Sequence, residues 1–429
     1  MTRPEAGTGR ITLAQIAFRF CLLYFALYAL LIAWVLFPLL GPLGRVFRPG
    51  LWTAALTDPI TGWVGRTVFG VDAVLRLDSG AGDQAAAWVL AFCMLVAAAV
   101  ATAVWSAVDR RAHPRLPAWV LLFARVLLGG QMLSFGFAKL IPTQMPAPAL
   151  AQLLQPYGEF SPASVLWLQI GSSYPYEMAL GAAEVAAGLL LFVPRTAVLG
   201  ALASMTCMAQ VLLTNLTFDI PEKLLALHLL ALGTLVLAPH LRGLLDVFLR
   251  QRAWAATIPA LFADRRRNRA AVWIQVALGL WIALGGGIDR WIVWHEQAGA
   301  ARPKSELYGI WQVREFSLDG QPLPPLTTDE NRWQRLVFDA PASATYQRMN
   351  GELVPARASF AAGGRLELAT PQGTVLATLT SERTGKGRLL LHGTLRDRPV
   401  VITLEELDPN SFPLRSRGFH WVQDYPDFR

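Results

Sequence analysis

Residues 176–239 read YEMALGAAEVAAGLLLFVPRTAVLGALASMTCMAQVLLTNLTFDIPEKLLALHLLALGTLVLAP. The stretch holds three long apolar runs, near 176–194, 196–214 and 222–238, divided by two short polar connections. A helix needs about 20 mostly apolar residues to cross the hydrocarbon core of a bilayer. The stretch therefore predicts three membrane-spanning helices joined by short turns.

Four further apolar runs flank this stretch, near 19–40, 85–106, 117–139 and 270–288. The whole 429-residue chain is 54% hydrophobic and only 16% charged. A soluble chain usually carries about 25% charged residues, so a single soluble domain is excluded. We expect a membrane α-helical bundle of about seven transmembrane helices.

The pattern changes after Trp294. Short segments alternate apolar with polar residues, and glycine, proline and Asp/Asn clusters separate them. The segments are YGIWQVREFSL, RWQRLVFD, ARASFA, RLELAT, TVLATLT, RLLLHGTL, VVITLEEL and FHWVQ. Such alternation is typical of half-buried strands, so we expect a C-terminal all-β antiparallel domain, a meander or small barrel.

Four regions follow from these patterns. Residues 1–116 hold the first two helices and an interfacial loop, and residues 117–240 form a four-helix core. Residues 241–294 combine a cytoplasmic interfacial segment with the seventh helix. Residues 295–429 form the β domain.

The net charge of +8 is unevenly distributed along the chain. The β domain is balanced, so the excess lies between the apolar runs, as expected for charge that orients helices in a membrane and not for a nucleic-acid-binding surface. Arginine is concentrated in the loops after the second, fourth and sixth helices, whereas residues 140–175 contain no Lys or Arg. Because cytoplasmic loops are rich in Lys and Arg, we expect a cytoplasmic N-terminus and an extracytoplasmic β domain.

Lysine is rare in this chain, and two of its four lysines, Lys139 and Lys223, lie at helix ends expected to face outside. A chain that otherwise uses arginine and keeps lysine here can require a compact, titratable ammonium group. The alternative is chance combined with snorkelling of the side chain to the interface.

Two ionisable residues lie deep within predicted helices. Glu184 lies roughly 12 Å and His228 roughly 10 Å below the outer boundary, at 1.5 Å per residue. Ionisable groups at such depth are costly and often functional, and the two are deep enough to meet. A structural pair that holds the bundle together is the alternative.

The connection NLTFDIPEK places Asn215, Asp219 and Lys223 together at one turn. Asp219 followed by Glu222 fits a capping box at the start of the next helix, with Pro221 in its first turn. A capping box leaves Asn215 and Lys223 unexplained, so all three are candidate ligand-binding residues.

Other site types lack a sequence signature. The chain has no C-x-x-C motif, no nucleotide-binding glycine loop and no histidine pair suited to one haem, so we predict no metal, haem or nucleotide site. Trp311, Trp333 and Trp421 are expected to be core residues of the β domain.

The segment from Val126 to Pro239 resembles the DoxX-like family of bacterial membrane proteins. Its marks are Gly136, Lys139, Glu184, Gly188, Arg195-Thr196, Asn215, Asp219, Lys223 and His228. The family takes its name from a membrane subunit of a thiosulfate:quinone oxidoreductase, and the resemblance implies the bacterial inner (cytoplasmic) membrane. This chain adds two N-terminal helices, a seventh helix and a β domain. Gly309-Ile310-Trp311 is similar to the start of a lipocalin-type barrel.

Two functions follow as hypotheses. In the first, the bundle binds an isoprenoid quinone or another lipid-like molecule in its outer half, as a subunit of a quinone-linked oxidoreductase. Glu184 and His228 then exchange protons, and Lys139 or Lys223 stabilises an oxyanion. In the second, a non-catalytic envelope protein binds lipid or scaffolds a complex, its β domain contacts an envelope protein, and Glu184, Lys139 and Lys223 form a buried ion-pair network. A transporter ranks last.

Overall fold

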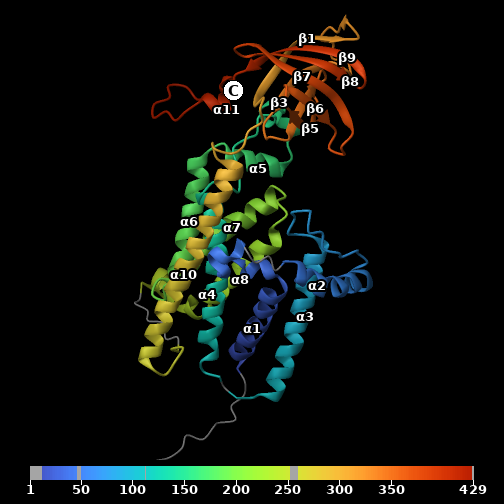
Figure 1. Ribbon diagram of the computed structural model, residues 1–429. Coiled ribbons are helices and arrows are strands. Elements are labelled where there is room, and N and C mark those ends of the chain that lie inside the picture. The colour runs from blue at the N-terminus through green and yellow to red at the C-terminus, as the bar shows by residue number, and fades with distance from the viewer. Residues whose placement is uncertain (1–11, 46–49, 112, 252–258, 428–429) are drawn as a thin grey trace, which may run out of the picture. The chain divides into compact units, whose positions relative to one another are not determined.

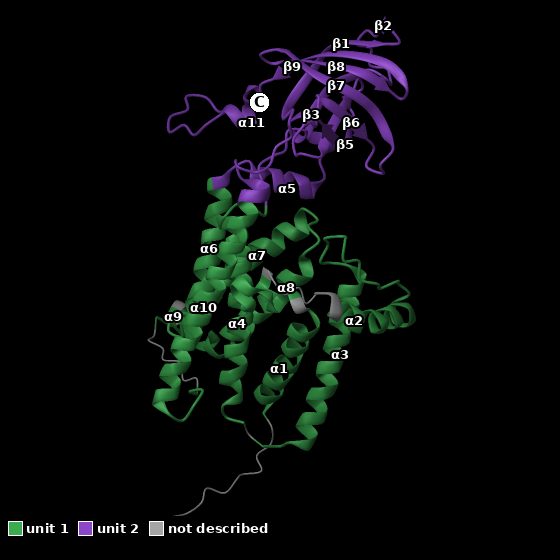
Figure 2. Cartoon of the chain, viewed as in Figure 1, with its two compact units in different colours: residues 1–144, 175–294 green, residues 145–174, 295–429 purple. Residues whose placement is uncertain are grey.

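The computed structural model describes residues 12–45, 50–111, 113–251 and 259–427. The chain forms two compact units (Figure 2): residues 1–144 with 175–294, called here the helical unit, and residues 145–174 with 295–429, called the β unit. Residues 145–174 therefore group with the β strands, although the sequence pattern placed them in the 117–240 core.

Within the described residues, seven helical segments are long and apolar enough to cross a membrane, so the protein is a multi-pass membrane protein. Figure 1 shows them in the helical unit. They are α1 (Leu13–Leu31), α3 (Ala85–Val108), α4 (Leu116–Leu140), α6 (Tyr174–Phe192), α7 (Ala197–Thr217), the segment Lys223–Val247, which begins with α8 (Lys223–Leu237), and the segment Arg265–Ala298, which begins with α10 (Arg265–Val293).

The first apolar run is shorter as a helix than the sequence suggests. We expected a helix near 19–40, but α1 ends at Leu31, and the 3-10 segment η1 (Ala33–Arg45) follows. Pro38 and Pro42 lie within η1, and Gly41 has a φ of 53°, so a regular helix cannot continue there.

Shorter helical segments connect the spans. In the helical unit they are α2 (Gly50–Val64), η2 (Gly65–Phe69), η5 (Ala238–His240) and α9 (Leu241–Arg250). The segment η6 (Trp294–Ala298) begins at the last residue of the helical unit and continues into the β unit. In the β unit they are η3 (Gln152–Leu154), η4 (Tyr157–Glu159), α5 (Pro162–Gly171), η7 (Pro409–Ser411) and α11 (Pro413–Ser416). The expected interfacial helix between residues 241 and 262 is α9 as far as Arg250, and residues 252–258 lie outside the described part.

Glycine contacts bring α4 and α6 together. A Cβ atom on Gly181 would lie 2.6 Å from the carbonyl oxygen of Gly136, and one on Gly136 would lie 2.7 Å from the amide nitrogen of Val185. Seven residues further along α6, a Cβ atom on Gly188 would lie 3.2 Å from the carbonyl oxygen of Gly129, which is seven residues before Gly136 on α4. Small residues allow membrane helices to approach closely, so the two backbones meet directly on this face.

The β unit contains a closed antiparallel barrel of eight strands, with a short additional strand β2 (Gln321–Pro322) on β1. The eight are β1 (Gly309–Leu318), β3 (Trp333–Phe338), β4 (Ser343–Arg348), β5 (Leu353–Ala361), β6 (Arg365–Ala369), β7 (Val375–Gly385), β8 (Arg388–Leu395) and β9 (Arg398–Leu407). Consecutive strands pair, and β9 returns to pair with β1. Closure leaves the ring without an unpaired edge.

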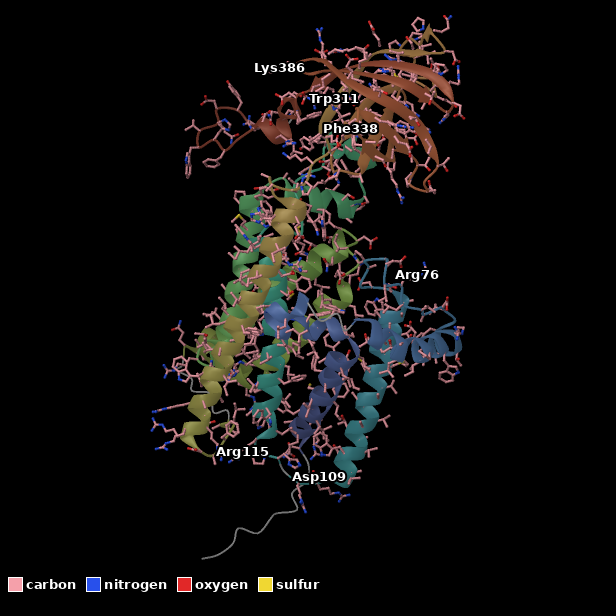
Figure 3. The ribbon with its side chains drawn as sticks, viewed as in Figure 1. Arg76, Asp109, Arg115, Trp311, Phe338 and Lys386 are labelled. Carbon is pink, nitrogen blue, oxygen red and sulfur yellow. The ribbon has the colours of Figure 1, made fainter. Side chains whose placement is uncertain are left out.

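The barrel interior is a packed apolar core. Trp311 and Trp333 are 1% and 3% exposed, and they belong to one cluster of buried side chains from all eight strands. Figure 3 labels Trp311 and Phe338 among these strands. The two tryptophans are therefore core residues, as the sequence predicted.

Two expectations for the β domain were wrong. FHWVQ is not a strand, and Trp421 in it is 91% exposed, because the barrel is already closed by β9 before this segment begins. The segment SATYQR, which the alternation pattern did not single out, forms β4 and pairs with β3 and β5.

Candidate functional site

A buried ion pair joins α4 and α6. Lys139, in the last turn of α4, donates from Nζ to both carboxylate oxygens of Glu184, at 2.9 and 2.8 Å. Lys139 is 6% and Glu184 3% exposed. The two residues, which the second hypothesis placed together in an ion-pair network, are direct partners and are called here the buried ion pair.

The glycine contacts explain how the pair is buried. Glu184 lies between Gly181 and Gly188 on α6, on the part of the helix that meets the α4 backbone. Removing one member of a buried pair leaves an uncompensated charge and typically costs about 3–5 kcal/mol. The pair therefore holds the two helices together whatever else it does.

His228 has different partners from those expected. Its Nε2 lies 2.8 Å from the hydroxyl of Tyr24, and its Nδ1 lies 2.7 Å from the carbonyl oxygen of Leu224. Because a carbonyl oxygen only accepts, Nδ1 carries a proton and donates to Leu224. In the neutral imidazole, Nε2 then accepts from the Tyr24 hydroxyl.

Two tyrosines of α1 enclose this ring. Tyr28 stacks on it with centroids 4.2 Å apart, and Tyr24 lies at 5.8 Å on a nearly parallel plane. Tyr28 is buried, whereas Tyr24 is half-buried. We call Tyr24, Tyr28 and His228 the histidine stack.

The structure does not join Glu184 to His228 by a hydrogen bond or an ion pair. Each has its polar atoms engaged elsewhere, Glu184 by Lys139 and His228 by Tyr24 and Leu224. The prediction rested on similar depth in α6 and α8, and depth does not specify rotation about the helix axis. The expected contact between the two is therefore not made.

The turn before α8 is capped by a residue that the sequence analysis missed. Asp83 accepts the backbone N–H of Lys223 at 2.7 Å and of Leu224 at 2.8 Å, which satisfies two donors at the start of α8. Asp219 does not cap the helix, so the expected capping box is wrong. Its backbone is left-handed, with φ 54°, and α8 begins only at Lys223.

Lys223 and Asn215 also belong to this turn. Lys223 donates from Nζ to Asp219 at 3.1 Å and to the carbonyl oxygen of Ile220 at 3.0 Å, and Asp83 lies 3.7 Å away. Asn215, 4% exposed, donates to the carbonyl oxygen of Glu222 at 3.0 Å. Asp83, Asn215, Asp219, Glu222 and Lys223 are called here the turn cluster.

The Glu222 side chain lies beside the loop that carries Asp83. Its carboxylate packs on Gly82, where a Cβ atom would collide with it. Burial, together with the neighbouring Asp83 carboxylate, raises the pKa of Glu222 to about 7. Its protonation therefore changes near neutral pH, without any ligand.

The turn cluster and the histidine stack are continuous. The N–H of Leu224 donates to Asp83, and the carbonyl oxygen of the same residue accepts from His228 one turn further along α8. Asp83, the first turn of α8, His228 and Tyr24 thus form one hydrogen-bonded series that leads from a loop into the bundle. Lys223 contacts this series, and it is not part of the buried ion pair.

Sequence reasoning missed several residues of this region. Tyr24 and Tyr28 are four residues apart on one face of the first helix, a spacing that can be read from the sequence but does not identify the partner helix. Glu177 is completely buried and lies seven residues before Glu184, so both project from the same side of α6.

Among the described residues, no group of three or more His, Cys, Asp or Glu is placed to hold a metal ion.

Comparisons with known proteins give one similarity. The chain is 28% identical over 133 residues to the uncharacterized protein YwoB of Bacillus subtilis (strain 168), a match that covers 29% of this chain and 79% of YwoB. No family model matches the chain. No solved structure matches it either.

Proposed function

We propose that the helical unit binds a quinone or another lipid-like small molecule, with the polar head group of the ligand at the histidine stack. One observation carries this proposal: His228 is 6% exposed, yet its acceptor nitrogen pairs with the hydroxyl of Tyr24, a half-buried residue on α1. Only 22% of the α1 span is buried within the protein, so a ligand dissolved in the membrane can approach along this helix.

The chemistry of the pair suits a quinone. The Tyr24 hydroxyl, turned away from His228, can donate to a quinone carbonyl oxygen, and Nε2 of His228 can accept from the hydroxyl of the reduced form. Glu222 lies in the turn before the same helix, and its pKa of about 7 suits proton exchange with water at neutral pH. Electrons come from a partner protein or a reduced substrate, as in a subunit of a quinone-linked oxidoreductase.

The resemblance to the DoxX-like family supports the same proposal, because His228, Lys223, Asp219 and Asn215 are among its marks. We also propose the bacterial inner membrane, with a cytoplasmic N-terminus and the β unit outside, from the arginine-rich loops. In this orientation the histidine stack and the buried ion pair lie in the outer half of the membrane.

A second function is favoured by the buried ion pair. Its lysine and carboxylate satisfy each other at 2.8–2.9 Å, as in a structural element that needs no ligand. On this alternative the protein is a non-catalytic envelope protein that binds lipid or supports a complex, and the β unit contacts an envelope partner.

Mass spectrometry of organic extracts separates the two proposals. The full-length protein would be purified in mild detergent as wild type, His228→Gln, Glu184→Gln/Lys139→Met and the control His392→Gln, which changes an exposed histidine of the barrel. We expect a quinone or one lipid at near-stoichiometric amounts in wild type and control, and at least tenfold less in His228→Gln. Equal extracts from a folded His228→Gln protein would contradict ligand binding at the stack.

A further inference from the structure

A pocket lies in the helical unit at the end of α4 opposite Lys139. It has a volume of about 320 Å³ and is enclosed by the first turns of α4, α7 and α10, the ends of α6 and α8, and Pro259–Leu261. Its walls are mostly apolar, but four polar side chains line it, and none is an Asp or Glu: Arg125, His240, Asn268 and Gln275. Arg125 is 14 residues from Lys139 on α4, roughly 21 Å along the helix, so this pocket is separate from the ion pair.

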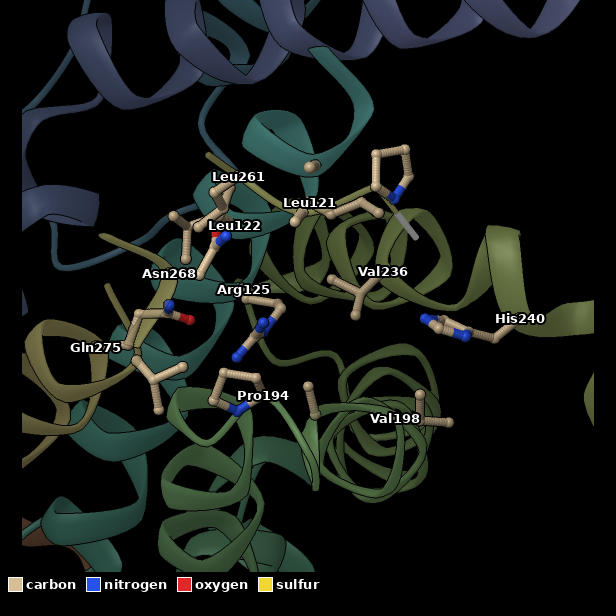
Figure 4. A pocket seen from close by; sticks show the side chains of 15 residues that line it. Leu121, Leu122, Arg125, Pro194, Val198, Val236, His240, Leu261, Asn268 and Gln275 are labelled. Carbon is tan, nitrogen blue, oxygen red and sulfur yellow. The ribbon is translucent and has the colours of Figure 1, made fainter. Parts of the chain in front are cut away.

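Arg125 retains unused hydrogen-bond donors. Its Nε and Nη2 both donate to the carbonyl oxygen of Leu191, at 2.9 and 2.6 Å, and so cap the end of α6. A guanidinium has five N–H donors, so three remain, and the described residues offer them no acceptor and no carboxylate within 4 Å. In Figure 4 the Arg125 side chain lies between Gln275 on one side and His240 on the other.

Gln275 presents an unmet acceptor to the same pocket. The residue is 6% exposed, and its Nε2 donates to the carbonyl oxygen of Ala271 at 2.9 Å. Its Oε1 is buried and has no hydrogen-bond donor among the described residues. A buried acceptor without a donor is unfavourable, so the site is incomplete without a ligand that carries a hydroxyl or another donor.

The wall beside Gln275 is fixed in place. Asn268 uses its amide to bond the backbone N–H and carbonyl oxygen of Phe262, at 3.0 and 2.8 Å, and the carbonyl oxygen of Asp264 at 3.0 Å. These bonds hold the segment that closes the pocket against the start of α10. The pocket is therefore preformed, as ligand pockets usually are.

The surroundings favour an anionic ligand from the membrane. The helix α10 begins with Arg265, Arg266 and Arg267, and Arg195 lies in the turn between α6 and α7. Basic residues at a membrane surface attract acidic lipids, and arginine binds phosphate oxygens through several N–H donors at once.

We propose that this pocket binds an acidic phosphodiester lipid whose head group carries hydroxyls. Its phosphate accepts hydrogen bonds from Arg125, a head-group hydroxyl donates to Oε1 of Gln275, and the apolar wall formed by Leu121, Val198 and Val236 takes the start of an acyl chain. This site lies beyond the function proposed above and does not depend on it.

Binding of short-chain phosphatidylglycerol to the full-length protein in mild detergent tests the proposal. Short-chain phosphatidylcholine and inorganic phosphate serve as the comparison ligands. The variants are Arg125→Gln, Gln275→Leu and the control Arg242→Gln, which removes the same charge from an exposed position on α9. We expect Arg125→Gln to weaken phosphatidylglycerol binding about 10- to 100-fold, Gln275→Leu about 3- to 10-fold, and Arg242→Gln less than about twofold.

Gln275→Leu also tests the site if Arg125→Gln does not fold, because it removes an unmet acceptor and should raise the thermal stability of the lipid-free protein. Wild-type affinity in this variant, or equal affinity for the two lipids in wild type, would overturn the proposal. If inorganic phosphate binds as tightly as the lipid, the pocket is an anion site, and the proposal that its ligand is a lipid is refuted.

Discussion

The helical unit and the β unit differ in the kinds of side chains that they bury. The barrel satisfies its backbone through closed strand pairing and fills its interior with apolar side chains such as Trp311, Phe316 and Leu391. The helical unit also buries ionisable and amide side chains, and some of them, such as Lys139 with Glu184, pair across helices. The buried ones are Arg19, Gln131, Lys139, Glu177, Glu184, Asn215, His228, His240 and Gln275. The difference indicates that polar chemistry is concentrated among the helices and that the barrel is a packed scaffold.

Long-range capping is a second difference. Asp83 satisfies the first N–H groups of α8, Arg19 donates to the carbonyl oxygen of Asp109 just beyond α3, and Arg125 donates to that of Leu191 in α6. Helix ends need partners for their unpaired backbone groups, and here distant side chains provide them. The barrel closes its backbone bonds between neighbouring strands, and Arg332 and Gln347 are examples of the polar side chains that it buries.

The largest effect is expected at the buried ion pair. Glu184→Gln leaves the Lys139 ammonium buried without its partner, and we expect a loss of about 3–5 kcal/mol in stability. The double variant Glu184→Gln/Lys139→Met should recover most of that loss. Thermal unfolding in detergent measures the stability of the two variants. If Glu184→Gln and the double variant are equally stable, the two side chains do not stabilise the protein through their interaction.

A similar loss is expected in the barrel for a different reason. Trp311→Ala removes a side chain that is 1% exposed, and the cavity should cost about 3–5 kcal/mol. Trp421→Ala is the matched control, and since Trp421 is 91% exposed we expect a change within about 0.5 kcal/mol. Near-ultraviolet circular dichroism during unfolding measures the stability of both variants. Equal losses of stability in Trp311→Ala and Trp421→Ala would refute the description of Trp311 as a packed core residue.

A smaller effect is expected at the turn cluster. Asp83→Ala removes the side chain that caps α8, which should cost about 1–2 kcal/mol. Asp219→Ala removes only an exposed ion pair with Lys223, so we expect about 0.5 kcal/mol or less. Hydrogen exchange of the Lys223 and Leu224 amides would locate the change, and faster exchange in Asp219→Ala than in Asp83→Ala would reverse the assignment.

The smallest effect is a pH dependence that the barrel should lack. The pKa of Glu222 is raised from 4.5 to about 7, so the folded protein holds this proton more tightly than the unfolded chain does. The favourable contribution is full below pH 4.5 and is lost as the pH rises to about 7. Because Glu222 is partly exposed, solvent screening limits the loss to about 1 kcal/mol, and Glu222→Gln should abolish it. An unchanged pH profile of unfolding in that variant would exclude Glu222 as the source.

Much of the architecture could be predicted because it is local. Apolar runs of about 20 residues identified seven spans, and alternation identified most barrel strands. The errors arose where local pattern and tertiary context disagree. The apolar run from 19 to 40 includes Pro38, which lies in the 3-10 segment after the end of α1 at Leu31, and FHWVQ alternates without a neighbouring strand to pair with.

Most of the candidate site was predicted as single residues, and the pair of Glu184 with Lys139 was anticipated only as part of a wider ion-pair network with Lys223. Depth alone identified Glu184 and His228 as unusual, because a charge or imidazole within an apolar run is costly whatever surrounds it. Their partners, Lys139 for the first and Tyr24 with Tyr28 for the second, depend on how α4, α6, α1 and α8 are rotated about their axes. That rotation is decided by packing, here by the contacts of Gly136 and Gly181.

The sequence by itself determined that the chain spans a membrane several times, where a barrel of strands begins, and which residues are expensive to bury. Hydrophobic run length and periodicity carry that information because they act between neighbours along the chain. Only the tertiary structure decided that Lys139 pairs with Glu184, that Asp83 caps α8 from 140 residues away, and that Arg125 and Gln275 share a pocket. Those contacts join distant segments, and they exist only once helix packing has set both distance and direction.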